Sequence, residues 1–278
     1  MDKNKSGNIY RIICIVLLII LIGVVATWGY KIIAENRANN KYVEIQNTVN
    51  SVSGQDDNSI SEVDETEEVF EEEMETELEE IVYTLPEIPQ KNLDWESLSK
   101  ENEDIYAWIY IPGTLVDYPI VQHPTDDSYY LNHNIDGSYG KPGCIYTEKI
   151  NSKDFTNYNT VIYGHNMKNG DMFGSLHDYE DNTFFEENPY VYVYTKENVF
   201  VYEIFAAYVT SNAHILNTND FSTQEGFAEY LDNVVYNKNS VGNFKTGSKV
   251  SSDNRIITLS TCTSASNQRW LVQAVLVN

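Results

Sequence analysis

The chain has 278 residues, 42% of them hydrophobic, which suits one domain of ordinary size with accessory segments. Its 42 acidic and 18 basic residues give a formal net charge of -24. This balance argues against a nucleic-acid-binding function, because contacts to phosphates need a basic surface. We interpret the acidic surface mainly as a source of solubility, with attraction for a cationic amine substrate as a weaker alternative.

The first 30 residues have the pattern of a membrane anchor. An uncharged run over residues 12–30 would span roughly 28 Å as a helix, close to the hydrocarbon core of a bilayer. It ends with interfacial aromatics, Trp28 and Tyr30, and it follows three cations. A cleaved signal peptide is the alternative. The run is long for that, and no small-x-small cleavage site follows, so we expect an uncleaved anchor with a cytoplasmic N-terminus.

A polar segment separates this anchor from the rest of the chain. Residues 31–50 have a polar, helical pattern, and residues 56–80 contain 14 acids and no Lys or Arg. Such a composition buries too little apolar surface to offset its ordering entropy. We therefore expect an extracellular polar and acidic spacer over residues 31–90. The globular domain is expected over residues 91–278.

Short strand-like runs dominate that domain, separated by Gly, Pro, Asn and Asp. Asp94 can cap a short helix, and residues 223–236 have apolar side chains at helical spacing. Eight short strands with few helices predict a mainly β fold with peripheral helices, closed into a barrel. The expected strands are residues 107–111, 118–122, 144–147, 160–163, 190–194, 200–210, 255–261 and 270–277.

The three cysteines do not form a recognisable framework. Cys14 lies in the apolar run, whereas Cys144 and Cys262 lie in the expected domain and could pair. A zinc site is conceivable, but no pair of candidate ligands has the i,i+4 spacing of a helical metal site. We expect no metal and no cofactor. The conceivable zinc ligands are Cys144, His123, His133 and His165.

Cys262 ends an apolar, β-branched strand and is followed by a six-residue polar loop and then by Arg269. A hairpin of this kind brings the guanidinium beside the thiol, where it favours the thiolate and can stabilise an oxyanion. Taken alone, a cysteine is more often buried and structural. His165, just past another strand in VIYGHNM, changes that balance, because a cysteine nucleophile needs a partner for proton transfer.

These motifs resemble the sortase family. TLSTC followed by Arg, with YGHN upstream, is similar to the family's catalytic signature. YPIVQ, then YYLN, the block VIYGHNMKNGDMFGSLHDY and the helix before TLSTC are similar to class B. The resemblance covers about residues 91–278 and implies a closed, eight-stranded, sortase-like barrel.

The resemblance also implies roles for particular residues. Cys262 would be the nucleophile, His165 the general acid and base, and Arg269 the group that stabilises the oxyanion and the substrate. Asp127 stands where the family can have Asn, Thr263 stands where an acidic residue can follow the cysteine, and the loop before Arg269 is short. The positions that match the family's sorting-signal groove are Ser260, Thr261, Leu131 and Asp127.

The implied reaction is transpeptidation at the surface of a Gram-positive-type cell. The enzyme would cleave a C-terminal sorting motif of a secreted protein at a Thr carbonyl and form a thioacyl-enzyme on Cys262. It would then transfer the protein to a peptidoglycan cross-bridge amine. Two alternatives stay open at this point: a pilin-polymerising sortase that uses a protein Lys amine, and a non-catalytic surface-binding module.

Overall fold

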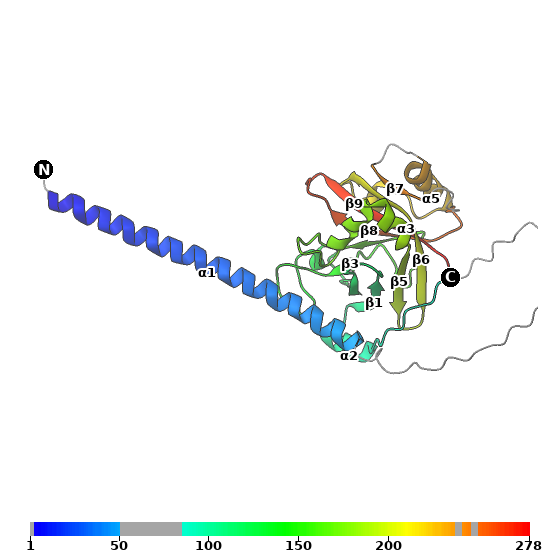
Figure 1. Cartoon of the computed structure of the whole chain (residues 1–278), viewed down its shortest axis with the longest axis horizontal. Coiled ribbons are helices and arrows are strands. Elements are labelled where there is room, and N and C mark those ends of the chain that lie inside the picture. The colour runs from blue at the N-terminus through cyan, green and yellow to red at the C-terminus, as the bar shows by residue number, and fades with distance from the viewer. Residues whose placement is uncertain (1–2, 51–84, 237–240, 246–249) are drawn as a thin grey trace, which may run out of the picture.

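Eight strands form a closed barrel in the computed structural model, which describes residues 3–50, 85–236, 241–245 and 250–278 (Figure 1). The order around the barrel is β5-β1-β2-β3-β4-β8-β9-β6, and a β5–β6 pairing closes it. The predicted closed eight-stranded barrel is therefore confirmed. Its strands are β1 (Ile105–Tyr110), β2 (Asp117–Val121), β3 (Ile145–Thr147), β4 (Asn159–Tyr163), β5 (Tyr190–Thr195), β6 (Val199–Ser211), β8 (Ile256–Cys262) and β9 (Gln268–Leu276).

Each of the eight expected strand segments overlaps one of these strands, because runs of β-branched and aromatic residues suit a barrel wall. β8 is buried at every position except its last residue, so both of its faces are covered. The sequence did not predict β7 (Gly242–Phe244), a ninth strand that pairs with β6 outside the closed ring.

Short helices lie around the barrel, and side-chain caps begin three of them. Asp94 accepts from the amides of Glu96 and Ser97 at the start of α2 (Trp95–Glu101), as expected. The helix expected over residues 223–236 is α-helical only in α5 (Gln224–Leu231) and continues as a π-helical turn, η3 (Asp232–Tyr236). The remaining helices are η1 (Tyr129–Leu131), η2 (Gly174–Glu180), α3 (Asn182–Glu187) and α4 (Ile215–Thr218).

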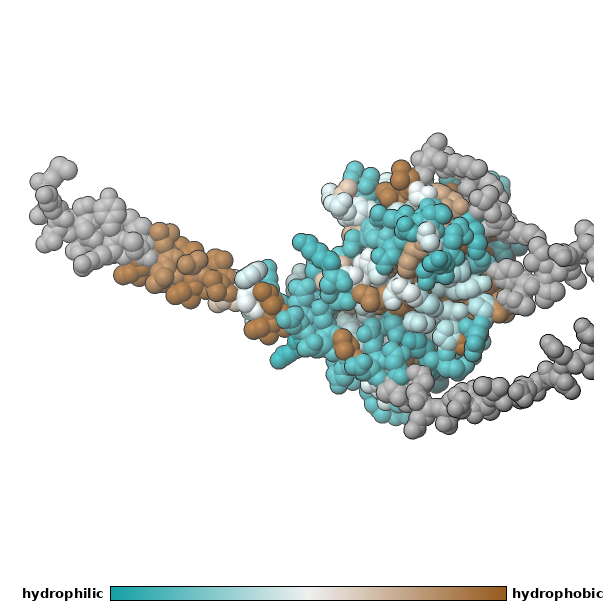
Figure 2. All heavy atoms as spheres, in the orientation of Figure 1, coloured by the Kyte–Doolittle hydropathy of each residue, from teal (hydrophilic) through white to brown (hydrophobic). Residues whose placement is uncertain are grey.

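The N-terminal helix α1 (Lys3–Asn50) is continuous from the apolar segment to the barrel domain (Figure 1). Its apolar part is long and hydrophobic enough to cross a membrane, with a mean hydropathy of 2.3 and no buried residues in its most apolar window. Figure 2 shows this part as a hydrophobic band outside the domain. The other end of α1 packs on the domain through a buried stripe of Ala38, Tyr42, Ile45 and Val49.

The expected spacer therefore includes residues that belong to the packed domain. The side chain of Asn50 accepts a hydrogen bond of 2.9 Å from Lys91 Nζ, so the end of α1 lies beside the first residue of the expected domain. Residues 51–84, which contain most of the expected acidic spacer, lie outside the described residues. The boundaries at residues 30 and 90 stay predictions.

A buried polar cluster connects α5 to the strands that carry the site. Gln273 in β9 is fully buried, and its Nε2 donates to the Tyr230 hydroxyl at 2.6 Å and to Thr258 Oγ1 at 2.8 Å. Its Oε1 accepts from the Tyr208 hydroxyl at 3.2 Å. Every polar atom of this amide side chain is thus engaged, which is what makes its burial tolerable.

We predict that Gln273→Leu destabilises the protein, because it removes the buried amide that accepts from the Tyr208 hydroxyl and donates to Tyr230 and Thr258. The expected cost of about 2 kcal/mol corresponds to a Tm lower by about 4–8 °C, measured by calorimetry on the full chain in detergent. Gln224→Leu is the matched control, because Gln224 is exposed and its side chain makes exposed hydrogen bonds to Ser252 and Asp253 rather than to the core. Equal midpoints for the two variants would contradict the assigned role of the cluster.

Candidate active site

The pairing of three strands brings the ends of β4, β8 and β9 to one edge of the barrel. β4 runs parallel to β8, with Tyr163 opposite Ser260, and the Gly164 amide donates to the Ser260 carbonyl at 3.2 Å. His165 follows immediately. β8 and β9 form an antiparallel hairpin in which Cys262 is opposite Arg269. Residues far apart in sequence therefore meet because parallel strands end at the same edge.

A cavity of about 400 Å³ opens at this edge. All seven residues singled out from the sequence line it, and the cysteine side chain is half-buried. They come from the ends of β4, β8 and β9 and from the segment between β2 and β3. These lining residues are Cys262, His165, Arg269, Ser260, Thr261, Leu131 and Asp127.

His165 is held in one orientation by a backbone contact. Its Nε2 lies 2.7 Å from the Leu131 carbonyl oxygen, and because that oxygen can only accept, Nε2 carries a proton. The other ring nitrogen, Nδ1, does not take part in this contact. Burial lowers the pKa of His165; the hydrogen bond to Leu131 opposes this shift, and the charge of Lys141 adds to it.

The main chain of the cysteine is fixed by two side chains. The Cys262 carbonyl accepts from Asn166 Nδ2 at 2.9 Å and lies 3.0 Å from His177 Nε2. His177 Nδ1 is 2.6 Å from a Glu180 carboxylate oxygen, and the His177 ring stacks on the Trp270 ring with ring centres 5.7 Å apart. The sequence analysis did not single out Asn166, His177 and Glu180 as site residues. The signal available was their proximity to the YGHN motif and the i,i+3 spacing of His177 and Glu180 on η2.

The turn after the cysteine is closed by Thr263. Its Oγ1 accepts from the Ala265 amide at 3.1 Å and lies 3.1 Å from the Ala265 carbonyl. This turn lies inside the six-residue loop between Cys262 and Arg269 and helps the chain to reverse direction there. Arg269 is half-buried, and its Nη1 donates to the neighbouring Gln268 carbonyl at 2.9 Å.

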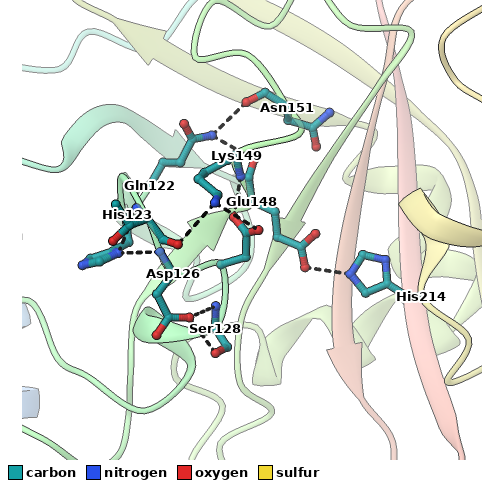
Figure 3. Close-up of polar contacts among 10 residues, drawn as sticks. Gln122, His123, Asp126, Ser128, Glu148, Lys149, Asn151 and His214 are labelled. Carbon is teal, nitrogen blue, oxygen red and sulfur yellow. Dashed lines mark hydrogen bonds and ion pairs between the residues drawn. The ribbon is translucent and has the colours of Figure 1, made fainter.

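Several polar side chains besides the cysteine, the histidine and the arginine line the cavity. Asp127 Oδ1 accepts a hydrogen bond from the Lys149 amide at 2.8 Å, so this carboxylate oxygen helps to fix the chain after β3. His214 Nε2 lies 2.8 Å from a Glu148 carboxylate oxygen, and both residues line the cavity (Figure 3). The sequence predicted neither Glu148 nor His214 as a site residue. Thr261 Oγ1 is buried and has no hydrogen-bond partner among the described residues.

Cys144 differs from Cys262 in its surroundings. Both thiols are free, so the possible disulfide between them does not form. The side chain of Cys144 is buried, 3.1 Å from the Tyr42 hydroxyl and 3.3 Å from the His133 carbonyl. Burial raises the pKa of the Cys144 thiol to about 12, which makes it unreactive at neutral pH.

Comparison with known proteins agrees with this geometry. The family model for the sortase domain matches residues 109–277. Sortase B of Listeria monocytogenes is 37% identical over 183 residues, which is 65% of this chain and 72% of that protein. Sortase B of Staphylococcus aureus is 32% identical over 171 residues, 62% of this chain and 68% of that protein.

Solved structures of sortase B have the same fold. The Clostridium perfringens enzyme superposes with a TM-score of 0.60 at 30% identity and covers 66% of this chain and 100% of that one. A Staphylococcus aureus sortase B–substrate complex has a TM-score of 0.58 at 31% identity, with coverage of 66% and 84%. The family is one of transpeptidases, so the alternative of a non-catalytic binding module is set aside. The chain belongs to the sortase family, cysteine transpeptidases associated with the membrane at the cell surface, and its matched relatives are class B enzymes.

Proposed function

We propose that Cys262 is the nucleophile that cleaves a C-terminal sorting motif at a Thr carbonyl, and that the acyl group then passes to an amine of the peptidoglycan cross-bridge. One observation carries the proposal: Cys262, His165 and Arg269 line a single cavity at the shared edge of β4, β8 and β9. A thiol, an imidazole and a guanidinium are the groups that acyl transfer from an amide requires.

The first half-reaction breaks the amide. The Cys262 thiolate forms a bond to the Thr carbonyl carbon, and the carbonyl oxygen takes the negative charge beside the Arg269 guanidinium. The C–N bond then breaks, His165 donates a proton to the departing amine, and a thioester remains on Cys262.

The second half-reaction forms the new amide. The acceptor amine attacks the thioester carbonyl and gives a proton to His165, and the Cys262 thiolate departs. No proton or electron is gained or lost overall, and the chemistry uses no metal or organic cofactor.

His165 Nδ1 is the atom assigned to both proton transfers, because Nε2–H is engaged by the Leu131 carbonyl. Burial of the ring disfavours the imidazolium and so lowers the pKa of His165. The Leu131 carbonyl faces a ring N–H and favours the charged ring, which opposes that effect. The balance of these two effects on the pKa of His165 sets the fraction of enzyme whose imidazolium can protonate the leaving amine.

The sorting peptide is assigned to the wall formed by Leu131, Ser260, Thr261 and Asp127. The buried and unpartnered Thr261 Oγ1 offers a hydrogen bond to the peptide. The Asp127 carboxylate, already bonded to the Lys149 amide, contributes negative charge at the rim. Leu131 is 39% exposed and provides an apolar contact.

The proposed location is the outer face of the cell membrane. Residues 1–30 form a cytoplasmic tail and membrane span, because Lys3, Lys5 and Arg11 precede the apolar run. Residues 31–90, whose docked stripe of α1 packs on the domain, and the catalytic domain of residues 91–278 lie outside. The proposed partners are secreted proteins with a sorting motif and a peptidoglycan amine.

We predict that the full chain, incubated with a library of peptides in detergent, acquires an acyl adduct on Cys262 that mass spectrometry detects. The adduct should be absent from Cys262→Ala and present in Cys144→Ala, whose thiol is buried. Release of the adduct by a cross-bridge peptide but not by a pilin Lys peptide supports wall anchoring. The reverse preference would favour the pilin polymerase, and an adduct on another residue would refute the nucleophile.

We predict that Arg269→Lys lowers kcat/KM for a cleaved peptide by about 10²-fold, because the charge remains but the planar pair of donors is lost. Steady-state kinetics with a fluorogenic sorting peptide measures this. Arg255→Lys is the matched control, because Arg255 lies outside the cavity and donates to the Thr156 carbonyl. Rates like those of the control would mean that Arg269 does not act as proposed.

We predict that Lys141→Gln raises the pKa of His165, because the positive charge of Lys141 lowers it in the native protein. NMR titration of the histidine ring protons measures the midpoint, with His165→Gln used to assign the signal. The imidazolium form of His165 should therefore persist to higher pH in the variant than in the native protein. Lys153→Gln, which changes a cation beside Tyr106, should leave the midpoint unchanged. A midpoint that stays or falls in Lys141→Gln contradicts the electrostatic account.

A further inference from the structure

The docked end of α1 lies behind the loop that orients His165. Tyr42 is 3% exposed, and its hydroxyl donates to the Gly143 carbonyl at 2.7 Å. Its ring meets Tyr118 of β2 edge to face, with ring centres 5.7 Å apart. A side chain of the membrane helix is therefore built into the core of the barrel domain.

The Gly143 segment in turn touches the residues that hold the histidine. A Cβ at Gly143 would lie 2.9 Å from the carbonyl oxygens of Tyr130 and Leu131 and 3.3 Å from His165 Cδ2. The next amide, that of Cys144, donates to the Tyr130 carbonyl at 3.0 Å. Because the Leu131 carbonyl accepts from His165 Nε2, only one backbone segment separates Tyr42 from the histidine.

We propose that Tyr42 is a positioning residue for the active site: it holds Gly143 against residues 130–131 and thereby keeps the Leu131 carbonyl aligned with His165. The membrane helix is then part of the catalytic unit as well as its anchor. This inference rests on the role proposed above for His165.

The docking of α1 is anchored on both sides of Tyr42. Lys41 Nζ lies 2.6 Å from a Glu101 carboxylate oxygen. Gln46 Nε2 donates to the Asp117 carbonyl at 2.7 Å. These contacts join α1 to the end of α2, which lies beside the docked end of α1 in Figure 1, and to the start of β2, so the helix is placed independently of the Tyr42 hydroxyl. Removing that hydroxyl alone should leave α1 in place and change only its contacts with the Gly143 carbonyl and with Cys144 Sγ, the next residue of the same loop.

The helix also sets the distance between its apolar run and the stripe that packs on the domain. Ala38, the first buried residue of the stripe, is eight residues beyond Tyr30, the last residue of the apolar run, a rise of about 12 Å along a helix. The helical connection through α1, and not the segment after Asn50, fixes this distance.

The test is Tyr42→Phe in the full chain, reconstituted in detergent or nanodiscs. We expect kcat to fall about tenfold with KM nearly unchanged, because the histidine loses alignment while the peptide wall is intact. The pKa of His165 should also fall, since the Leu131 hydrogen bond that raises it is weakened. NMR titration measures this on folded molecules only, so partial unfolding of the variant does not obscure the result.

Tyr194→Phe is the matched control, because it removes a buried hydroxyl that donates to the Pro89 carbonyl at 2.7 Å, outside the cavity. A Tyr42→Phe enzyme with the kcat and the His165 titration of this control would overturn the inference. So would a loss of activity with an unchanged titration, since that indicates general destabilisation. His165→Ala separates the two proposals. If this variant stays active, the role proposed for His165 is wrong; if it is inactive while Tyr42→Phe behaves like the control, only the role of Tyr42 is wrong.

Discussion

The candidate active site depends on the parallel pairing of β4 with β8. Their register sets Tyr163 opposite Ser260, so the chain leaving β4 and the chain leaving β8 emerge side by side. The β8–β9 hairpin then adds Arg269 opposite Cys262. A slip of one residue in either pairing would turn the alternate side chains to the other face of the barrel wall, and the cavity would lose its thiol or its guanidinium. The buried contacts of β8 and the polar cluster around Gln273 hold this register.

Around this frame, hydrogen bonds to main-chain carbonyls orient the residues of the candidate site. The Leu131 carbonyl fixes which ring nitrogen of His165 is free, and Asn166 and His177 hold the carbonyl of Cys262. Backbone acceptors make good supports because their own positions are set by strands and turns. A hydrogen bond of the same kind is found at α1, where the Tyr42 hydroxyl donates to the Gly143 carbonyl. Helix α1 and the candidate site are thus linked through hydrogen bonds to main-chain carbonyls.

Much of this could be predicted from the sequence. Alternating and β-branched runs gave strand segments that overlap all eight strands of the barrel, and Asp94 gave the start of α2. The VIYGHNM and TLSTC motifs pointed to residues that the fold brings to one cavity. β7 was missed because three residues carry too little periodicity to be recognised. The end of the α-helical part of residues 223–236 was missed because apolar spacing alone does not distinguish an α-helix from a π-helical turn.

By itself, the sequence determined the class of fold, the family and the candidate nucleophile, because these depend on local periodicity and on short motifs. Only the tertiary structure decided that His177 lies against the Cys262 carbonyl and that Glu148 pairs with His214, since in both cases the partner is distant in sequence. It also decided that the polar part of α1 packs into the domain. A stripe of four buried residues on an otherwise polar helix has too weak a pattern to predict, and its burial is set by the shape of the surface formed by β2 and the Gly143 loop.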